Sequence, residues 1–222
     1  MEAFNSFYMD FFTQLRNGKR RECTDLVIDL LEKGTDIKDI YVNIFQKSLV
    51  DIGALWQQNK ITVADEHLCT AIIQSIMMAL YRFITPDKPH NKKAVIACIG
   101  NELHEVGARM VSDFFEMDGW DVTYLGANVP TRDILSTITS NNADLLGISC
   151  TLTKNVEFVK ELISLSRDCK SNIVIAVGGY CFNSNPLLYK YVNADIWSSD
   201  AQGTVKLSKE LIFKGDSYVI NG

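Results

Sequence analysis

The feature that most constrains the fold is an alternation of two hydrophobic periodicities that begins after residue 93. Short, continuously apolar runs alternate there with longer segments whose apolar residues recur every three or four positions. The apolar runs cover 94–99, 122–125, 145–149, 173–177 and 196–198, and the helical segments cover 106–117, 131–139, 156–166, 187–191 and 205–213. Such alternation is typical of parallel strands joined by right-handed helical crossovers. The sequence therefore predicts an α/β domain over residues 94–222, with a Rossmann-like (flavodoxin-like) five-stranded parallel sheet.

Residues 1–85 have only the helical periodicity. Their apolar positions group into four segments, at 4–15, 23–31, 40–55 and from 62 onward. Thr62 followed by Asp65 resembles a capping box at the start of the fourth segment. Connections this short favour antiparallel neighbours, so we expect a four-helix bundle. The polar stretch 86–93, which contains Pro86 and Pro89, is the expected linker between the two domains.

Charge and cysteine content exclude several classes of protein. The chain has 22 Lys+Arg against 27 Asp+Glu, a net charge of −5, which argues against a protein that coats nucleic acid. The basic cluster of Arg16 and residues 19–21 is interpreted as a solvated helix start.

The N-terminus lacks secretory-signal features, and the most apolar stretch, 71–80, is too short to span a bilayer. Six cysteines without a CxxC pair indicate buried free thiols, so we expect a cytoplasmic protein with no membrane association.

Ligands of such parallel sheets bind at the carboxyl ends of the strands. The loops of interest therefore begin near Gly100, Gly126, Ser149 and Gly178. The polar or conformationally special residues in them are Glu102, His104, Gly107, Ser149, Thr151, Thr153, Gly178, Gly179 and Tyr180. No phosphate-binding loop, GxGxxG, GxSxG or zinc-type spacing is present. Taken singly, each residue also has an ordinary interpretation as a turn glycine, a capping hydroxyl or a loop histidine.

Taken together, ExHxxG, the Ser149 loop and the glycine pair resemble the cobalamin-binding domain, whose pattern is DxHxxG, then SxL or SxT, then GG. The resemblance extends from about residue 93 to the C-terminus. It implies that His104 ligates cobalt from below in place of the cofactor's dimethylbenzimidazole, with Glu102 and Ser149 completing a hydrogen-bonded relay. Glu102 stands where the family has aspartate. The displaced nucleotide tail would pass the residues Ser149, Thr151, Thr153, Gly178, Gly179 and Tyr180, with Gly107 leaving room for it.

The helical half carries a second resemblance. Trp56, nine further residues and then Glu66-His67 resemble the helical cap of light-sensing CarH/LitR-type regulators of the MerR family. This implies that Trp56, Glu66 and His67 cover the upper face of the corrin. Gln57 stands where those regulators can have a histidine that captures cobalt after photolysis, which leaves His67 as a substitute. The ordinary interpretation makes Trp56 a buried bundle anchor and Glu66-His67 polar residues of a first helical turn.

Two functions follow from these resemblances. The leading hypothesis is a stand-alone cobalamin-binding sensor that responds to light through photolysis of the cobalt–carbon bond, with adenosylcobalamin favoured and methylcobalamin as the other candidate. Its output would pass through a protein partner, such as a transcription regulator, or through a change in homo-oligomerisation, without direct DNA binding. The alternative is a corrinoid carrier protein that docks to a methyltransferase; a carrier subunit of a mutase is a weaker third. In none of these is the chain by itself an enzyme, because no acid–base pair remains for substrate chemistry.

Overall fold

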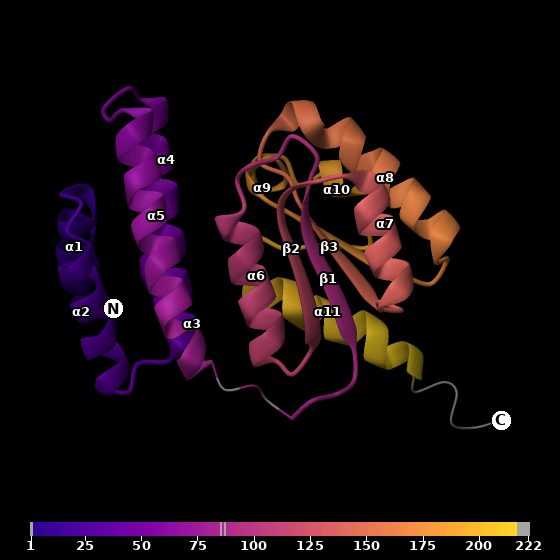
Figure 1. Cartoon of the computed structure of the whole chain (residues 1–222), viewed down its shortest axis with the longest axis horizontal. Coiled ribbons are helices and arrows are strands. Elements are labelled where there is room, and N and C mark those ends of the chain that lie inside the picture. Colours follow the sequence, from indigo (N-terminus) through magenta and orange to yellow (C-terminus); the bar gives the residue numbers. More distant parts are fainter. Residues whose placement is uncertain (1, 85, 87, 217–222) are drawn as a thin grey trace. The chain divides into compact units, whose positions relative to one another are not determined.

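The computed structural model describes residues 2–84, 86 and 88–216. The chain divides into two compact units, Met1–Thr85 and Pro86–Gly222. The first contains only helices, and the second contains a parallel sheet with helices on both faces (Figure 1).

The first unit confirms the predicted helical half. Its elements are α1 (Glu2–Arg16), α2 (Arg20–Glu32), α3 (Ile37–Ile40), the π-helical turn η1 (Tyr41–Gln46), α4 (Lys47–Gln57), α5 (Val63–Leu80) and the 3-10 turn η2 (Tyr81–Phe83). Because α3, η1 and α4 follow one another without a break, they form one long helix. The four resulting helices bury aromatic and aliphatic side chains such as Phe11, Phe45 and Ile72 against one another.

The helix α5 begins at the predicted capping box. The Thr62 hydroxyl accepts a hydrogen bond from the Asp65 backbone N–H at 3.2 Å, and the Asp65 carboxylate accepts one from the Thr62 N–H at 2.8 Å. Together with η2, the helix over 63–83 is long and apolar enough to cross a membrane, whereas the sequence stretch 71–80 was predicted to be too short. The helix starts earlier than that stretch. One such helix is weak evidence for a span, because the core helix of a bundle meets the same criteria.

The second unit contains the predicted five-stranded parallel sheet. Its strands are β1 (Lys93–Ile99), β2 (Asp121–Val129), β3 (Leu145–Ser149), β4 (Val174–Gly178) and β5 (Ile196–Trp197). Their spatial order is β2-β1-β3-β4-β5, and all neighbours pair in parallel. The chain therefore moves outward from β1 in both directions. The strand order reverses between β1 and β3, and ligands of such sheets bind outside the carboxyl ends of the strands at this reversal.

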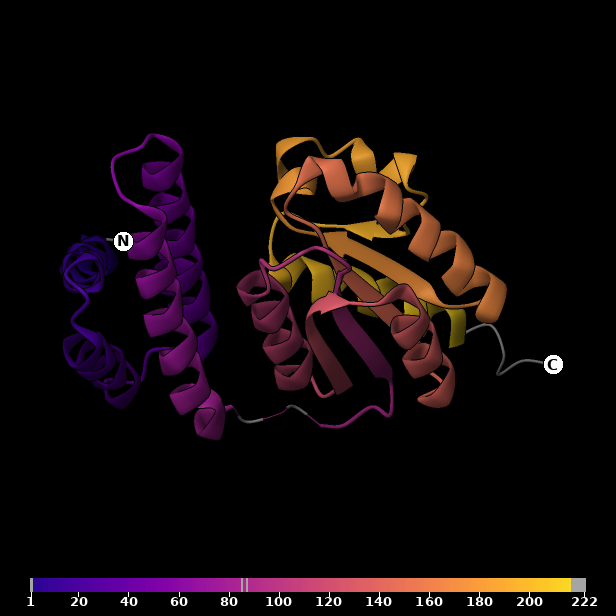
Figure 2. The same ribbon diagram turned by 45° about the horizontal axis from the view of Figure 1, so that its top comes forward.

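Helices cover both faces of this sheet (Figures 1 and 2). The elements are α6 (Val106–Met117), α7 (Thr131–Ser140), the 3-10 turn η3 (Thr153–Asn155), α8 (Val156–Cys169), α9 (Tyr180–Ser184), α10 (Leu188–Tyr191) and α11 (Ala201–Asp216). α7 and α8 pack on the face that carries Val95, Ala97 and Ile148, and α6 and α11 lie on the opposite face. The core on both faces holds the carboxyl ends of the strands in a rigid frame.

Four details differ from the sequence-based expectations. β2 continues to Val129, so Gly126 lies at a bulge inside the strand rather than at the start of a loop; its φ of +80° accommodates the register shift. β1 begins at Lys93, within the expected linker. Cys169, at the end of α8, is exposed rather than buried, while the other five cysteines are buried. α9 was not predicted, because five residues are too few to show a helical period.

Candidate functional site

The loops that follow β1 and β3 form the centre of the candidate site. These strands are neighbours, and Cys98 near the end of β1 pairs in register with Ser149 at the end of β3. The two chain segments that leave the sheet here, 100–105 and 150–155, therefore lie at the same point of the sheet edge. The strand order reverses at this same point, between β1 and β3, where ligands of such sheets bind.

Glu102 and His104 face each other within the first of these loops. The Glu102 Oε1 atom lies 2.5 Å from His104 Nδ1 and also accepts a hydrogen bond from the His104 backbone N–H at 3.2 Å. Glu102 is completely buried, whereas the His104 side chain is 54% exposed. A carboxylate at Nδ1 favours the tautomer with its proton on that nitrogen. The lone pair of Nε2 is then available for a metal.

The second oxygen of Glu102 is held by the loop after β3. Glu102 Oε2 accepts hydrogen bonds from the backbone N–H groups of Thr151 and Leu152, at 2.8 and 3.1 Å, and from the Asn155 side-chain amide at 3.5 Å. Burial alone would raise the pKa of Glu102. The hydrogen bonds from His104 and from the two backbone groups outweigh burial and lower the pKa below its usual value. Glu102 is thus a buried, ionised hydrogen-bond acceptor that joins the two loops.

Asn155 occupies the place in the relay that the sequence assigned to Ser149. No hydrogen bond joins Ser149 to Glu102, two residues that the structure describes fully. Asn155 precedes α8 and has the sequence signature of a helix cap, yet its side chain makes no capping hydrogen bond. The longer Glu102 side chain reaches this buried amide and the neighbouring backbone. In the structure, Glu102 is thus held by Asn155 and the backbone of the 150–155 loop, and the role of Ser149 stays a prediction.

The irregular end of β2 also supports the loop that carries His104. The Asn128 backbone N–H donates to the Glu102 carbonyl at 2.9 Å, and the Asn128 side chain accepts from the Asn101 N–H at 2.8 Å. The Glu105 carboxylate accepts from the Ala127 N–H at 3.0 Å and from the Tyr124 hydroxyl at 3.3 Å. Sequence reasoning missed these residues because it ended β2 before the bulge. The loop that carries His104 is consequently hydrogen-bonded both to the loop after β3 and to the end of β2.

The glycines near the site have two different roles. Gly179 has a φ of +100°, and a Cβ atom there would lie only 2.3 Å from the Cys150 carbonyl oxygen, so the fold requires glycine. A Cβ atom on Gly178 or Gly107 would meet no atom within 4 Å. These two glycines therefore leave space at the carboxyl end of β4 and at the start of α6.

The other predicted residues of the sheet unit lie on the loops of the same edge. Thr151 is half-buried and contributes its backbone N–H to Glu102, while Thr153 begins η3 and is exposed. Tyr180, the first residue of α9, is 59% exposed. The structure thus brings Glu102, His104 and the 149–155 loop into direct contact, with Gly178 in register beside Ser149.

The predicted cap residues all lie at one end of the helical hairpin formed by α4 and α5. Trp56 is 45% exposed, so it is not the buried bundle anchor of the ordinary interpretation. Gln57 is exposed at the end of α4. Glu66 accepts a hydrogen bond from the Thr70 hydroxyl at 2.8 Å, and its other oxygen lies 3.5 Å from Nε2 of the exposed His67. The exposed indole and imidazole leave this end of the hairpin able to contact a ligand.

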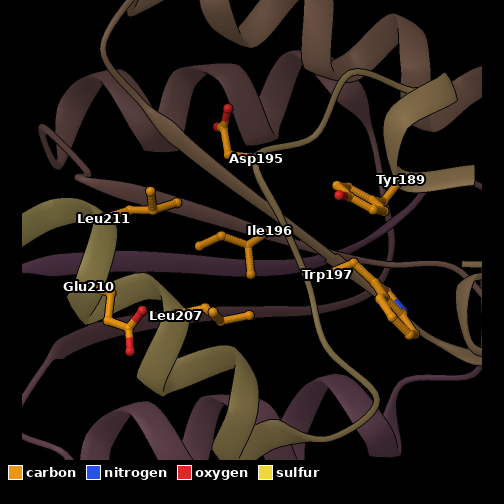
Figure 3. Close-up of a pocket in the computed structure, with 7 residues that line it drawn as sticks. All are labelled: Tyr189, Asp195, Ile196, Trp197, Leu207, Glu210 and Leu211. Atoms are coloured by element: carbon orange, nitrogen blue, oxygen red, sulfur yellow. The ribbon is translucent and has the colours of Figure 1, made fainter. Parts of the chain in front are cut away.

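A separate pocket lies at the β5 edge of the sheet (Figure 3). It is lined by Tyr189 of α10, by Asp195, Ile196 and Trp197 around β5, and by Leu207, Glu210 and Leu211 of α11. None of these residues belongs to the candidate site. β5 is separated from β1 by β3 and β4, so this pocket is not part of the arrangement around His104.

Comparison with protein families finds two matches that together cover most of the chain. Two family models, each described as a B12 binding domain, match residues 92–205 and residues 10–81. The first match includes every candidate residue of the sheet unit. The second includes Trp56, Gln57, Glu66 and His67.

Individual relatives divide into two kinds. Dimethylamine corrinoid protein 1 of Methanosarcina acetivorans is 21% identical over 195 residues, which cover 85% of this chain and 91% of that protein. The HTH-type transcriptional repressor CarH of Myxococcus xanthus is 28% identical over 138 residues, 62% of this chain but 46% of that protein. Among solved structures, the monomethylamine corrinoid protein of Methanosarcina barkeri has the same fold, with a TM-score of 0.81 at 15% identity over 93% of this chain and 99% of that one.

Proposed function

The chain belongs to the B12-binding domain family, and from this premise we propose that it is a corrinoid carrier protein that serves a methyltransferase. The observation that carries the proposal is the buried Glu102 carboxylate on His104 Nδ1, which leaves Nε2 of the half-exposed imidazole available in the loop that follows β1. When bound, the corrinoid supplies a cobalt centre that accepts and gives up a methyl group. The chain itself binds and orients the corrinoid, and its partner performs catalysis.

The residues present fit a cobalamin with its lower base displaced. His104 Nε2 is the proposed cobalt ligand, because the other ring nitrogen is already hydrogen-bonded and the side chain is exposed. Glu102 holds the imidazole plane and its proton, and Thr151, Leu152 and Asn155 hold Glu102. The space beside Gly178 and Gly107 is where the displaced nucleotide tail would enter. Ser149, Thr151, Thr153 and Tyr180 are the polar groups proposed to flank it.

The coverage of the relatives supports the carrier over the light sensor. The similarity to the dimethylamine corrinoid protein extends over nearly the whole of both chains. The similarity to CarH covers about half of that repressor. The carrier was the alternative hypothesis from the sequence, and it is the one that these comparisons favour. We therefore propose methylcobalamin as the functional form of the cofactor and a methyltransferase as the partner.

One observation favours the sensor as a second candidate. Trp56 is exposed at the end of the α4–α5 hairpin, with Glu66 and His67 nearby on α5. An exposed indole, with a carboxylate and an imidazole at the same end of the hairpin, suits the recognition of an adenosyl group as well as the shielding of a methyl group.

The two candidates are separated by their preference for the upper ligand. We expect the purified chain to bind methylcobalamin at least as tightly as adenosylcobalamin, as measured by absorption titration in the dark. We also expect illumination of either complex to leave the elution volume in size-exclusion chromatography unchanged. Trp56→Ala should then have little effect on methylcobalamin affinity. Tighter binding of adenosylcobalamin that depends on Trp56, together with a light-dependent elution volume, would establish the sensor instead.

Replacing Glu102 by glutamine tests the relay. In Glu102→Gln the side-chain NH₂ group must face either His104 Nδ1–H or the Thr151 and Leu152 amides, so a donor meets a donor. We expect cobalamin affinity to fall by about 10–100-fold, as is usual when the hydrogen-bond partner of a metal-ligating histidine is lost. Absorption titration measures the change. The control is Glu157→Gln, which changes an exposed carboxylate on α8 that accepts a hydrogen bond from the Tyr191 hydroxyl, and this variant should bind normally. Equal affinity of both variants would rule out the relay.

A further inference from the structure

We propose that the pocket at the β5 edge of the sheet binds a small arylalkylammonium cation, which is a flat apolar ring joined by a short chain to a protonated amine. The pocket has a volume of about 430 Å³, which lies within the range of small-molecule sites. Two strands, β3 and β4, separate β5 from the strand that leads to His104. The proposal is therefore independent of the cobalamin function proposed above.

Tyr189 and Trp197 form an aromatic end of the pocket (Figure 3). Their ring centroids are 6.5 Å apart, and their ring planes differ by only 19°. The Trp197 indole N–H donates a hydrogen bond to the Asn183 side-chain oxygen at 3.3 Å, which fixes the orientation of the indole. Two nearly parallel aromatic side chains offer flat apolar surface on which a further ring can stack. This end of the pocket therefore selects a flat apolar group.

Aliphatic side chains form the middle of the pocket. Ile196 of β5 and Leu207 of α11 lie between the aromatic end and the opposite end in Figure 3. Ile196 is buried, whereas Leu207 and Leu211, one helical turn apart on α11, are 37% and 50% exposed. A ligand that covers these two leucines removes apolar surface from water, which favours binding. The middle of the pocket therefore suits a short hydrocarbon chain.

The charged side chains that line the pocket are both carboxylates. They belong to Asp195 and Glu210, and none of the seven lining residues is basic. The Asp195 carboxylate is already occupied, because Oδ1 pairs with Arg167 Nη2 at 2.8 Å and Oδ2 accepts a hydrogen bond from the Ile175 N–H at 2.7 Å. Glu210 is exposed and forms no hydrogen bond or ion pair with any residue that the structure describes. Glu210 is therefore the carboxylate that is available to a ligand cation.

Charge and shape together define the class of ligand. Figure 3 shows Glu210 and Leu211 at the end of the pocket opposite to Tyr189 and Trp197. A ligand that uses both ends carries its positive charge at a distance from its flat ring, as an arylalkylammonium ion does. Its ammonium group donates charge-assisted hydrogen bonds to the Glu210 carboxylate. A ligand carboxylate in the same place would be repelled by Glu210, because like charges raise the electrostatic energy. Lys190 lies 5.9 Å from the Tyr189 ring but does not line the pocket.

Titration of the full chain with phenethylamine tests the proposal. The matched probes are 3-phenylpropanoate and 2-phenylethanol, which carry a carboxylate or a hydroxyl in place of the ammonium group. We expect phenethylamine to shift the indole N–H signal of Trp197 in NMR spectra, assigned with Trp197→Phe, and to leave those of Trp56 and Trp120 in place. Half-saturation is expected at or below about 10 mM, a range in which 3-phenylpropanoate should not bind. An unshifted Trp197 signal, or equally tight binding of either matched probe, overturns the proposal.

Two variants test how the ligand lies in the pocket. Glu210→Gln removes the charge of an exposed side chain, so it should weaken phenethylamine binding by about 3–5-fold, the effect of losing one exposed ion pair. Leu207→Lys places a competing ammonium group in the middle of the pocket and should abolish binding. The matched control is Glu161→Gln, which changes an exposed carboxylate of α8 outside the pocket and should bind phenethylamine like the unchanged chain. If Glu210→Gln also bound phenethylamine like the unchanged chain, the ammonium group would not face Glu210, and the proposed class of ligand would be wrong.

Discussion

His104→Ala is expected to abolish the absorption signature of histidine-ligated cobalt and to weaken cobalamin binding by more than the 10–100-fold expected for a lost hydrogen-bond partner. The variant removes the only proposed protein ligand to the metal. The fold should be unaffected, because the imidazole is more than half exposed and its loop is held by Glu102 and Asn128 through the backbone. Absorption spectra and equilibrium titration with methylcobalamin measure both effects.

His67→Ala is the matched control for this experiment. His67 is also exposed, at 74%, and its imidazole lies beside a glutamate, but it belongs to α5 of the helical unit. The carrier proposal expects this variant to retain the histidine-ligated spectrum. If His67→Ala lost that spectrum and His104→Ala kept it, the assignment of the cobalt ligand would be wrong.

Gly179→Ala is expected to destabilise the sheet unit by about 2–4 kcal/mol, the largest stability effect that the site predicts. Two causes act together: a φ of +100°, which an alanine rarely adopts, and a Cβ atom placed 2.3 Å from the Cys150 carbonyl oxygen. The Cys150 backbone cannot retreat easily, because its N–H is hydrogen-bonded to Gly178. Urea unfolding followed by circular dichroism measures the change.

The neighbouring variant Gly178→Ala separates stability from binding. An added Cβ atom there meets nothing within 4 Å, so the unfolding free energy should change by no more than about 0.5 kcal/mol. The same methyl group occupies the space proposed for the nucleotide tail, so cobalamin affinity should fall. If Gly178→Ala bound cobalamin normally, the nucleotide tail would not occupy the space beside residue 178.

The elements of this fold were predictable because each has a local hydrophobic pattern. The capping box of Thr62 and Asp65 and the strand–helix alternation after residue 93 depend on neighbouring residues, so the pattern alone indicates them. Errors arose where local pattern does not decide the structure. The continuation of β2 past Gly126 depends on pairing with β1, and five residues of α9 are too few to show a period.

The sequence by itself determined the two structural halves, the loops of the candidate site, and Glu102 and His104 as its candidate residues, because residue type and spacing are sufficient for these. Only the tertiary structure decided which groups hold Glu102. Asn155 lies 53 positions from Glu102 along the chain, and its sequence context indicates a helix cap. The hydrogen bond from the Cys150 N–H to the Gly178 carbonyl likewise depends on the adjacency of β3 and β4. Hydrogen bonds between distant segments follow from how strands pair and where loops leave the sheet, and a local pattern carries no information about either.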